Sequence, residues 1–154
     1  MYKYFSFFLF AVSVVIVIVP ACKKENDEEK ISKHNSSESR NMNGNCMNCH
    51  RQGGSGEGSF NIAGTVFANV AGTQKQPNGF VKLYTLPNGN GELKYTLEVD
   101  GLGNFYSTEN IDFSAGLYPA IVHANGNVKY MPQTITSGSC NSCHGVSTQN
   151  LWIN

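Results

Sequence analysis

The stretch Leu93-Lys94-Tyr95-Thr96-Leu97-Glu98-Val99 (LKYTLEV) alternates apolar and polar side chains without interruption. Successive side chains of a β-strand point to opposite faces, so this pattern is typical of a strand with one buried and one solvated face. No apolar stripe of helical period runs through the chain around it. The stretch therefore predicts a surface strand of a β-sheet.

Further strands are expected on both sides of this stretch. Residues 60–70 predict a first strand that carries Phe60, Ile62, Val66 and Val70 on one side, and residues 80–84 predict a second. Turn sequences separate the strands: Gln76-Pro77-Asn78-Gly79, Leu86-Pro87-Asn88-Gly89 and Asp100-Gly101-Leu102-Gly103-Asn104. Residues 117–124 and 127–131 predict a hairpin closed by Asn125-Gly126 as a two-residue turn, because both turn residues need a positive φ.

Six or seven short strands with turns at this spacing predict an all-β fold, a small antiparallel β-sandwich. Four short segments also resemble the carboxypeptidase-regulatory or transthyretin-like sandwich: Gly64-Thr65-Val66, Pro77-Asn78-Gly79, Asp100-Gly101-Leu102-Gly103-Asn104-Phe105 and Gly116-Leu117-Tyr118. The resemblance covers roughly residues 60–125 and implies that fold. A fold alone decides no chemistry.

The amino terminus reads as an export signal. Lys3 precedes an apolar run from Phe5 to Val19, which is shorter than the roughly 20 residues of a membrane-spanning helix. The following Val19-Pro20-Ala21-Cys22 resembles the lipobox of bacterial lipoproteins. That resemblance implies removal of residues 1–21 as a signal peptide and lipidation of Cys22. The alternative is cleavage by an ordinary signal peptidase, which would leave Cys22 free.

Residues 22–45 are rich in charged, serine and asparagine side chains, so they predict a flexible tether. The resemblance to lipoproteins implies that this tether is lipidated at Cys22. Residues 46–154 remain as the folded domain, enough for one modest core. The chain is expected to be exported as an outer-membrane lipoprotein, on the periplasmic face or at the cell surface. Lys3 is the only charged residue among 1–21, so 11 basic residues become 10 against 11 acidic ones, and no nucleic-acid partner is expected.

Four of the five cysteines lie in two pentapeptides, Cys46-Met47-Asn48-Cys49-His50 and Cys140-Asn141-Ser142-Cys143-His144. The spacing CxxCH is that of a c-type haem attachment site. The chain resembles bacterial dihaem c-type cytochrome lipoproteins in these positions. That resemblance implies two covalently attached haems, with thioether bonds at Cys46, Cys49, Cys140 and Cys143 and with His50 and His144 as iron ligands.

The same cysteines have two other possible uses, a zinc site and disulfides. Zinc can be held by two CxxC pairs, but the usual gap between such pairs is roughly 15–20 residues, and zinc gives no reason for either histidine. A disulfide within each CxxC is plausible outside the cytoplasm, yet so small a loop constrains the unfolded chain little. Export favours haem, because c-type haem is attached after export.

The second axial ligand of each iron has four candidates, which are His34, Met42, His123 and Met131. With a two-residue turn, His123 lies opposite Val128 on one face of the hairpin, and Met131 lies on the other face. Met131 precedes the loop to Cys140 and is the first candidate for the second haem. His34 is the candidate for the first haem, and His123 for either haem or for one on a neighbouring molecule. The alternatives are a core methionine and solvated histidines.

Together these features predict an electron-transfer protein, a membrane-anchored c-type cytochrome that passes electrons between redox protein partners without catalysis. The alternatives are a haem enzyme of peroxidase type with one open iron site, and a cell-surface binding module. A strand of eight residues is about 26 Å long. Haems at opposite ends of the sandwich would therefore need self-association of the protein to relay electrons, and the sequence leaves their separation open.

Overall fold

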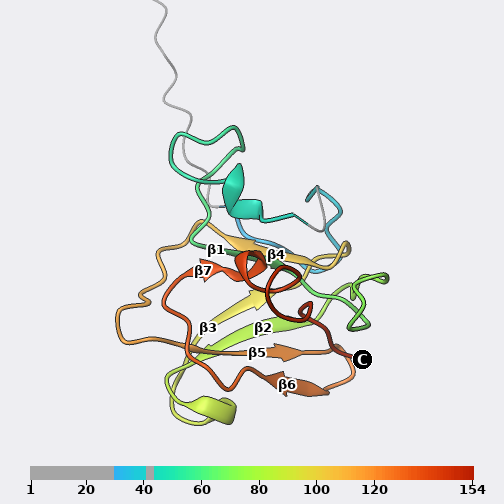
Figure 1. Ribbon diagram of the computed structural model, residues 1–154, viewed down its shortest axis with the longest axis vertical. Helices are drawn as coiled ribbons and strands as arrows, with labels where there is room; N and C mark the ends of the chain where they lie inside the picture. The colour runs from blue at the N-terminus through green and yellow to red at the C-terminus, as the bar shows by residue number, and fades with distance from the viewer. Residues whose placement is uncertain (1–29, 41–43) are drawn as a thin grey trace, which may run out of the picture.

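The computed structural model describes residues 30–40 and 44–154, and within these ranges the chain is built of strands (Figure 1). The seven strands are β1 (Ile62–Thr65), β2 (Phe80–Tyr84), β3 (Leu93–Glu98), β4 (Asn104–Ser107), β5 (Tyr118–Val122), β6 (Val128–Tyr130) and β7 (Gly138–Ser139). The helical elements of the described ranges are three 3₁₀ turns, η1 (Cys46–Asn48), η2 (Pro87–Gly89) and η3 (Cys140–Ser142). The prediction of an all-β fold is confirmed.

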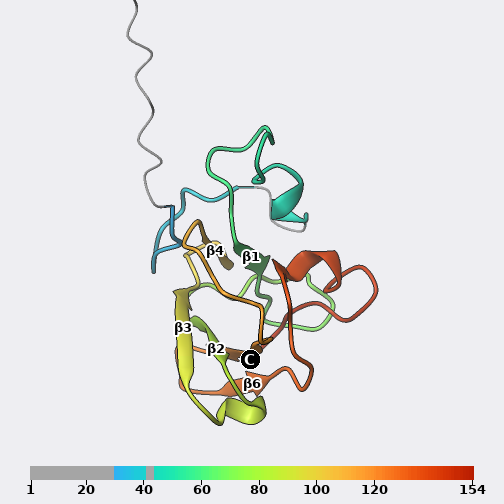
Figure 2. The same ribbon diagram turned by 90° about the vertical axis from the view of Figure 1, so that its left-hand side faces the viewer.

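The strands form two sheets, one in the order β4-β1-β7 and one in the order β3-β2-β5-β6. Figures 1 and 2 show them as two separate groups. All neighbouring strands are antiparallel except β1 and β7, where Ile62 pairs with Gly138 in the parallel sense. The prediction of a wholly antiparallel sandwich is therefore wrong at this pair. The chain leaves β6 in one sheet, crosses to the other, and joins the free edge of β1 running in the same direction.

The core lies between the two sheets. Along β2, Val81 and Leu83 are buried, and the alternate residues Phe80, Lys82 and Tyr84 are half-buried, as the alternating pattern requires. Leu97 of β3 joins them in the core, so the strand predicted from LKYTLEV is confirmed, and Ile62 and Phe105 cover them from the opposite sheet. Removal of this apolar surface from water stabilises the fold by about 25 cal/mol per Å².

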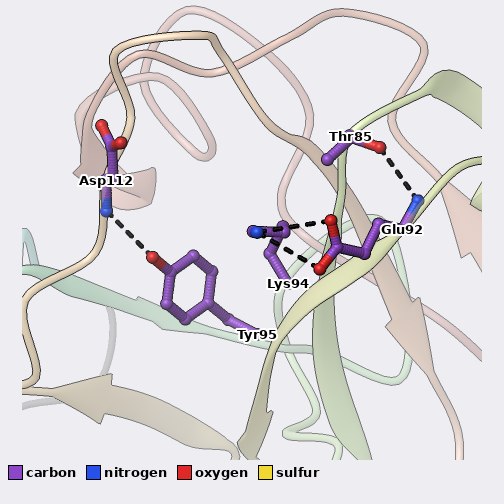
Figure 3. Close-up of polar contacts among 5 residues, drawn as sticks. All are labelled: Thr85, Glu92, Lys94, Tyr95 and Asp112. Atoms are coloured by element: carbon purple, nitrogen blue, oxygen red, sulfur yellow. Dashed lines mark hydrogen bonds and ion pairs between the residues drawn. The ribbon is translucent and has the colours of Figure 1, made fainter.

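Polar contacts link β3 to its neighbouring loops (Figure 3). The hydroxyl of Tyr95 accepts a hydrogen bond from the amide of Asp112 at 3.1 Å, which ties β3 to the loop that leads to β5. Thr85 Oγ1 accepts from the amide of Glu92 at 2.9 Å, and Lys94 pairs with the carboxylate of Glu92 at 3.2 Å. These bonds fix the β2–β3 hairpin.

The β5–β6 hairpin has a different register from the predicted one. Val122 pairs with Val128, so three residues, 124–126, form the turn and His123 lies opposite Asn127. Side chains inside the turn favour this longer loop, because His123 Nδ1 accepts from the amide of Asn125 at 2.9 Å and Asn125 Oδ1 accepts from that of Asn127 at 2.9 Å. A shift of one residue exchanges the faces of a strand, so Met131 lies on the face of Ile121 and not opposite to it.

Residues 30–40, which we call the N-terminal strap, lie along the edge shared by both sheets. Ile31 pairs with Ser107 as an antiparallel bridge. Ser32 is fully buried; its hydroxyl donates to the carbonyl of Glu98 at 2.6 Å, and its amide donates to that of Tyr106 at 2.9 Å. This part of the predicted tether is therefore docked on the domain, because its short polar side chains pair with the backbone of the sheet edges.

Several predictions concern residues that lie outside the described ranges. These are the signal peptide (residues 1–21), the lipidated Cys22, the tether residues 22–29 and the candidate ligand Met42. In the part of the chain that the structure describes, no helix has the length and apolar character needed to cross a membrane.

The carboxy-terminal residues lie beside β1. Phe67 donates its amide to the carbonyl of Leu151 at 2.7 Å and accepts from the amide of Ile153 at 2.9 Å, and Ile153 is buried in the core. Lys129 places its ammonium group over the ring of Trp152, 3.1 Å from the centroid. The segment that follows the second CxxCH motif is thus held against both sheets.

Candidate cofactor sites

The two CxxCH motifs, residues 46–50 and 140–144, fold in the same way. Each begins with a 3₁₀ turn, η1 or η3, and ends with the histidine amide donating to the carbonyl of the first cysteine. That bond measures 3.0 Å both from His50 to Cys46 and from His144 to Cys140. Each motif is therefore a single compact turn that carries two thiols and one imidazole.

His50 has one ring nitrogen engaged and one available. Its Nδ1 lies 2.9 Å from the carbonyl oxygen of Glu57. A carbonyl oxygen can only accept, so Nδ1 carries the proton, and Nε2 of the neutral ring keeps its lone pair for another partner. The ring stacks on Phe60 with centroids 4.0 Å apart and planes 7° apart, and Phe60 stacks in turn on Tyr106 at 4.8 Å.

A glycine makes room for the ring of His50. A Cβ atom placed on Gly56 would lie 2.7 Å from His50 Nδ1, closer than such atoms approach. Glycine at this position therefore lets the chain pass close to the ring on its way to Glu57, whose carbonyl fixes the ring's orientation.

His144 repeats this arrangement in the second motif. Its Nδ1 lies 2.8 Å from the carbonyl oxygen of Gln149, with the hydroxyl of Thr148 at 3.3 Å. The carbonyl again requires the proton on Nδ1, which leaves Nε2 with its lone pair. Both motifs thus present a histidine in the tautomer that binds a metal through Nε2.

The four thiols of the motifs are free and fall into two kinds. Cys49 and Cys143 are exposed, whereas Cys46 and Cys140 are half-buried. Cys140 packs against the core, and this burial, with smaller contributions from the nearby Cys46 and Cys143, raises the pKa of its thiol to about 12. Burial also raises the pKa of Cys46. Within the described residues, no disulfide joins these cysteines.

The two motifs are joined by a hydrogen bond between their flanking residues, although corresponding positions are 94 residues apart in the sequence. Ser139, the residue before Cys140, donates its hydroxyl to Oδ1 of Asn45, the residue before Cys46, at 3.1 Å. Figures 1 and 2 show η1 (teal) and η3 (orange-red) both near β1, which each of them contacts. The fold therefore places the residues that precede the two motifs in direct contact.

The second motif borders an apolar pocket of about 380 Å³ between the sheets. Cys140, His144 and Met131 all line it. Most of the other walls are core and carboxy-terminal side chains, including Ile62, Leu83, Phe105, Ile121, Leu151 and Trp152. The corrected hairpin register explains why Met131 is there, since its side chain shares the inner face with Ile121. The structure thus brings together the second motif and the methionine proposed as its ligand.

The first motif borders a wider pocket of about 1240 Å³ with mixed polar and apolar walls. Its lining residues from the motif are Cys46, Cys49 and His50. The facing wall is the N-terminal strap, which contributes His34 together with charged side chains such as Lys33 and Arg40. His123 lines neither this pocket nor the second one, because its ring is engaged in the β5–β6 turn.

The thiols and imidazoles do not converge on a common point. In the part of the chain that the structure describes, no group of three His, Cys, Asp or Glu side chains lies close enough to hold a metal ion directly. A zinc site would need four such ligands around one ion. Each motif carries two thiols and one imidazole and borders a pocket.

Sequence reasoning missed the partners that orient the two histidines. Every residue carries a backbone carbonyl, so no side-chain pattern singles out those of Glu57 and Gln149. The contact between Asn45 and Ser139 was missed as well, because it joins residues far apart in the chain. Comparison of the chain with family models, with curated proteins and with solved structures found no match.

Proposed function

We propose that this protein is a dihaem c-type cytochrome that carries electrons, with one haem bonded to each CxxCH motif. One observation carries the proposal: in both motifs a backbone carbonyl holds the histidine Nδ1–H, so that Nε2 is free to bind iron. Histidines that bind metals almost always donate their other ring N–H to such a partner, which fixes both tautomer and orientation.

The walls of both pockets support a haem as the ligand. A porphyrin is a flat apolar ring with two carboxylate arms, and apolar side chains surround the second pocket. The first pocket has the aromatic side chains Phe60 and Tyr106 in its lining, and it offers Lys33 and Arg40 as cations for the carboxylates. Haem iron supplies one-electron chemistry, and the protein tunes it through axial ligands, burial and hydrogen bonds.

The thiols fit the same assignment. Formation of a thioether with a haem vinyl group requires a free cysteine, and the four motif cysteines are free. Cys46 and Cys49 would bond the first haem, and Cys140 and Cys143 the second, with His50 and His144 as the axial ligands that follow.

Met131 is the second axial ligand that we propose for the second iron. It lines the same pocket as His144, and its amide donates to the carbonyl of Pro119 at 2.9 Å, which fixes its backbone beside β5. A thioether ligand paired with histidine raises the reduction potential relative to two histidines.

The remaining assignments rest on the sequence. The carboxypeptidase-regulatory or transthyretin-like fold, the lipid anchor at Cys22 and the outer-membrane location belong to the same proposal, as do redox proteins as partners. The protein would carry out no bond chemistry of its own. An open iron site in the purified protein would favour the peroxidase-type alternative.

The decisive experiment is the mass and visible spectrum of the full chain, expressed together with a c-type haem maturation system. We expect two covalently bound haems. The double variants Cys46→Ala/Cys49→Ala and Cys140→Ala/Cys143→Ala should each retain one haem. Cys22→Ser serves as the matched control, because it should lose the lipid and keep both haems. A colourless wild-type protein with four unmodified motif cysteines would refute the proposal.

A further inference from the structure

The N-terminal strap forms a wall of the first pocket. Its residues lie along the edge strands β3 and β4 and line the pocket together with Cys46, Cys49 and His50. His34 is the one histidine of the strap, and it lines the pocket. Its imidazole is a side chain that can bind a metal.

The backbone around His34 is fixed to the domain. The amide of His34 donates to Glu98 Oε2 at 2.7 Å. Asn35 and Asn78 exchange two hydrogen bonds of 3.0 Å, one from the Asn35 amide and one from the Asn78 side chain. The amide of Ser36 closes a turn onto the carbonyl of Lys33 at 3.0 Å. His34 therefore sits on a turn that is tied to β3 and to the loop before β2.

The ring of His34 differs from those of the other three histidines. His50 and His144 give Nδ1 to backbone carbonyls, and His123 accepts the amide of Asn125. Within the ranges that the structure describes, the imidazole of His34 makes no hydrogen bond. It is exposed on the wall of the pocket with both nitrogens available.

We propose that His34 is the second axial ligand of the haem held by residues 46–50, so that the strap is part of the first cofactor site. The inference rests on the proposed haem at this motif. It makes the two sites chemically different, with two histidines at the first iron and a histidine with a methionine at the second. The first iron then has the lower reduction potential of the two.

The proposal also links cofactor binding to docking of the strap. A bond from His34 to iron forms only when the strap lies on the domain, so the haem stabilises the docked strap by mass action. Hydrogen bonds from Ser32 to Glu98 and from Ser39 to Asp100 also hold the strap on the domain. Loss of the His34 ligand should therefore weaken the docking of the strap and leave one coordination position of the iron empty.

The test compares His34→Ala with the matched control Ser37→Ala, an exposed residue of the same strap, in the full chain carrying both haems. In His34→Ala we expect one of the two haems to become high-spin and to bind carbon monoxide when reduced. Added imidazole should restore its low-spin spectrum. Ser37→Ala should keep the wild-type spectrum, because a serine hydroxyl supplies no ligand to the iron.

A second variant keeps the test sharp if His34→Ala folds poorly. His34→Met supplies a thioether in place of the imidazole, and we expect one haem to stay low-spin with a raised potential. A two-haem protein whose spectrum, carbon monoxide binding and potentials are the same in wild type, His34→Ala and His34→Met would overturn the assignment of His34. That result would leave the two attached haems in place, so it differs from failure of the proposed function.

Discussion

At the scale of single residues, each CxxCH motif has one sheltered and one exposed thiol. The first cysteine of each motif is half-buried, and the second is exposed. Burial raises the pKa of the Cys140 thiol to about 12, so this thiol is protonated at neutral pH. Only the thiolate is a strong nucleophile, so the two kinds of cysteine should differ in reactivity.

We therefore predict that alkylation of the haem-free chain modifies Cys49 and Cys143 well before Cys140. At pH 8 a thiol with a pKa of about 12 has roughly a thousandfold less thiolate than an ordinary cysteine. A raised pKa means that reactivity grows as the pH rises toward that value. Peptide mass spectrometry over a time course at pH 7 and pH 9 measures the order. Equal rates at all four cysteines would contradict the sheltered position of Cys140.

The same residues show how far the sequence could predict the site. The spacing CxxCH made both histidines candidate iron ligands, because the residue types and their spacing define that motif. The hydrogen bonds that orient them go to backbone carbonyls and depend on how the following loop folds. The position of His34 depends on contacts with Glu98 and Asn78, far away in the chain, which its own neighbours do not encode.

At the scale of elements, the turn between β3 and β4 depends on one buried carboxylate. Asp100 is fully buried and accepts hydrogen bonds from the amides of Leu102 at 2.9 Å and Asn104 at 2.8 Å. Its other oxygen accepts from the hydroxyl of Ser39 in the strap. The turn and the strap are thus held by the same side chain.

Replacement of Asp100 by alanine should lower the free energy of unfolding by about 2–4 kcal/mol, since it leaves buried amides without a partner. Asp112→Ala is the matched control, because Asp112 is exposed and accepts the amide of Ser114 at the surface. We expect it to cost less than about 1 kcal/mol. Urea unfolding of both variants measures the difference. Similar losses in the two proteins would show that the turn does not need the buried carboxylate.

Elements were predictable where the pattern was regular. β2 and β3 followed from strict alternation, and the turn at residues 100–104 from its glycines and asparagine. The β5–β6 register was wrong by one residue because His123 and Asn125 bond within the turn and lengthen it. β7 has two residues, too few to carry any periodic signal.

At the scale of the whole molecule, the two pockets provide unlike surroundings for their ligands. The first is wide with polar and charged walls, and the second is smaller and apolar. Burial of haem iron away from water and charge tunes its potential, as does the type of axial ligand. Two haems in these pockets should therefore titrate at two distinct potentials.

Substitution of Met131 by histidine should lower the higher of the two potentials and leave the other nearly unchanged, because it replaces a thioether by an imidazole at the second iron. Tyr130→Phe is the control, since Tyr130 lines the same pocket without supplying a ligand to iron. A potentiometric titration followed by visible absorbance gives both values. If Met131→His left both potentials at their wild-type values, Met131 would not be a ligand.

The hydrogen bond between Asn45 and Ser139 links the two motifs, so in the proposed electron carrier it would affect how the two haems are reduced. Neighbouring centres repel one another once each has gained an electron, and the repulsion grows as the separation falls. The reduction potential for the second electron would thus be more negative than it would be without the first. If both haems are bound as proposed, such a domain would take up two electrons in two steps, and one docking partner could reduce or oxidise both centres.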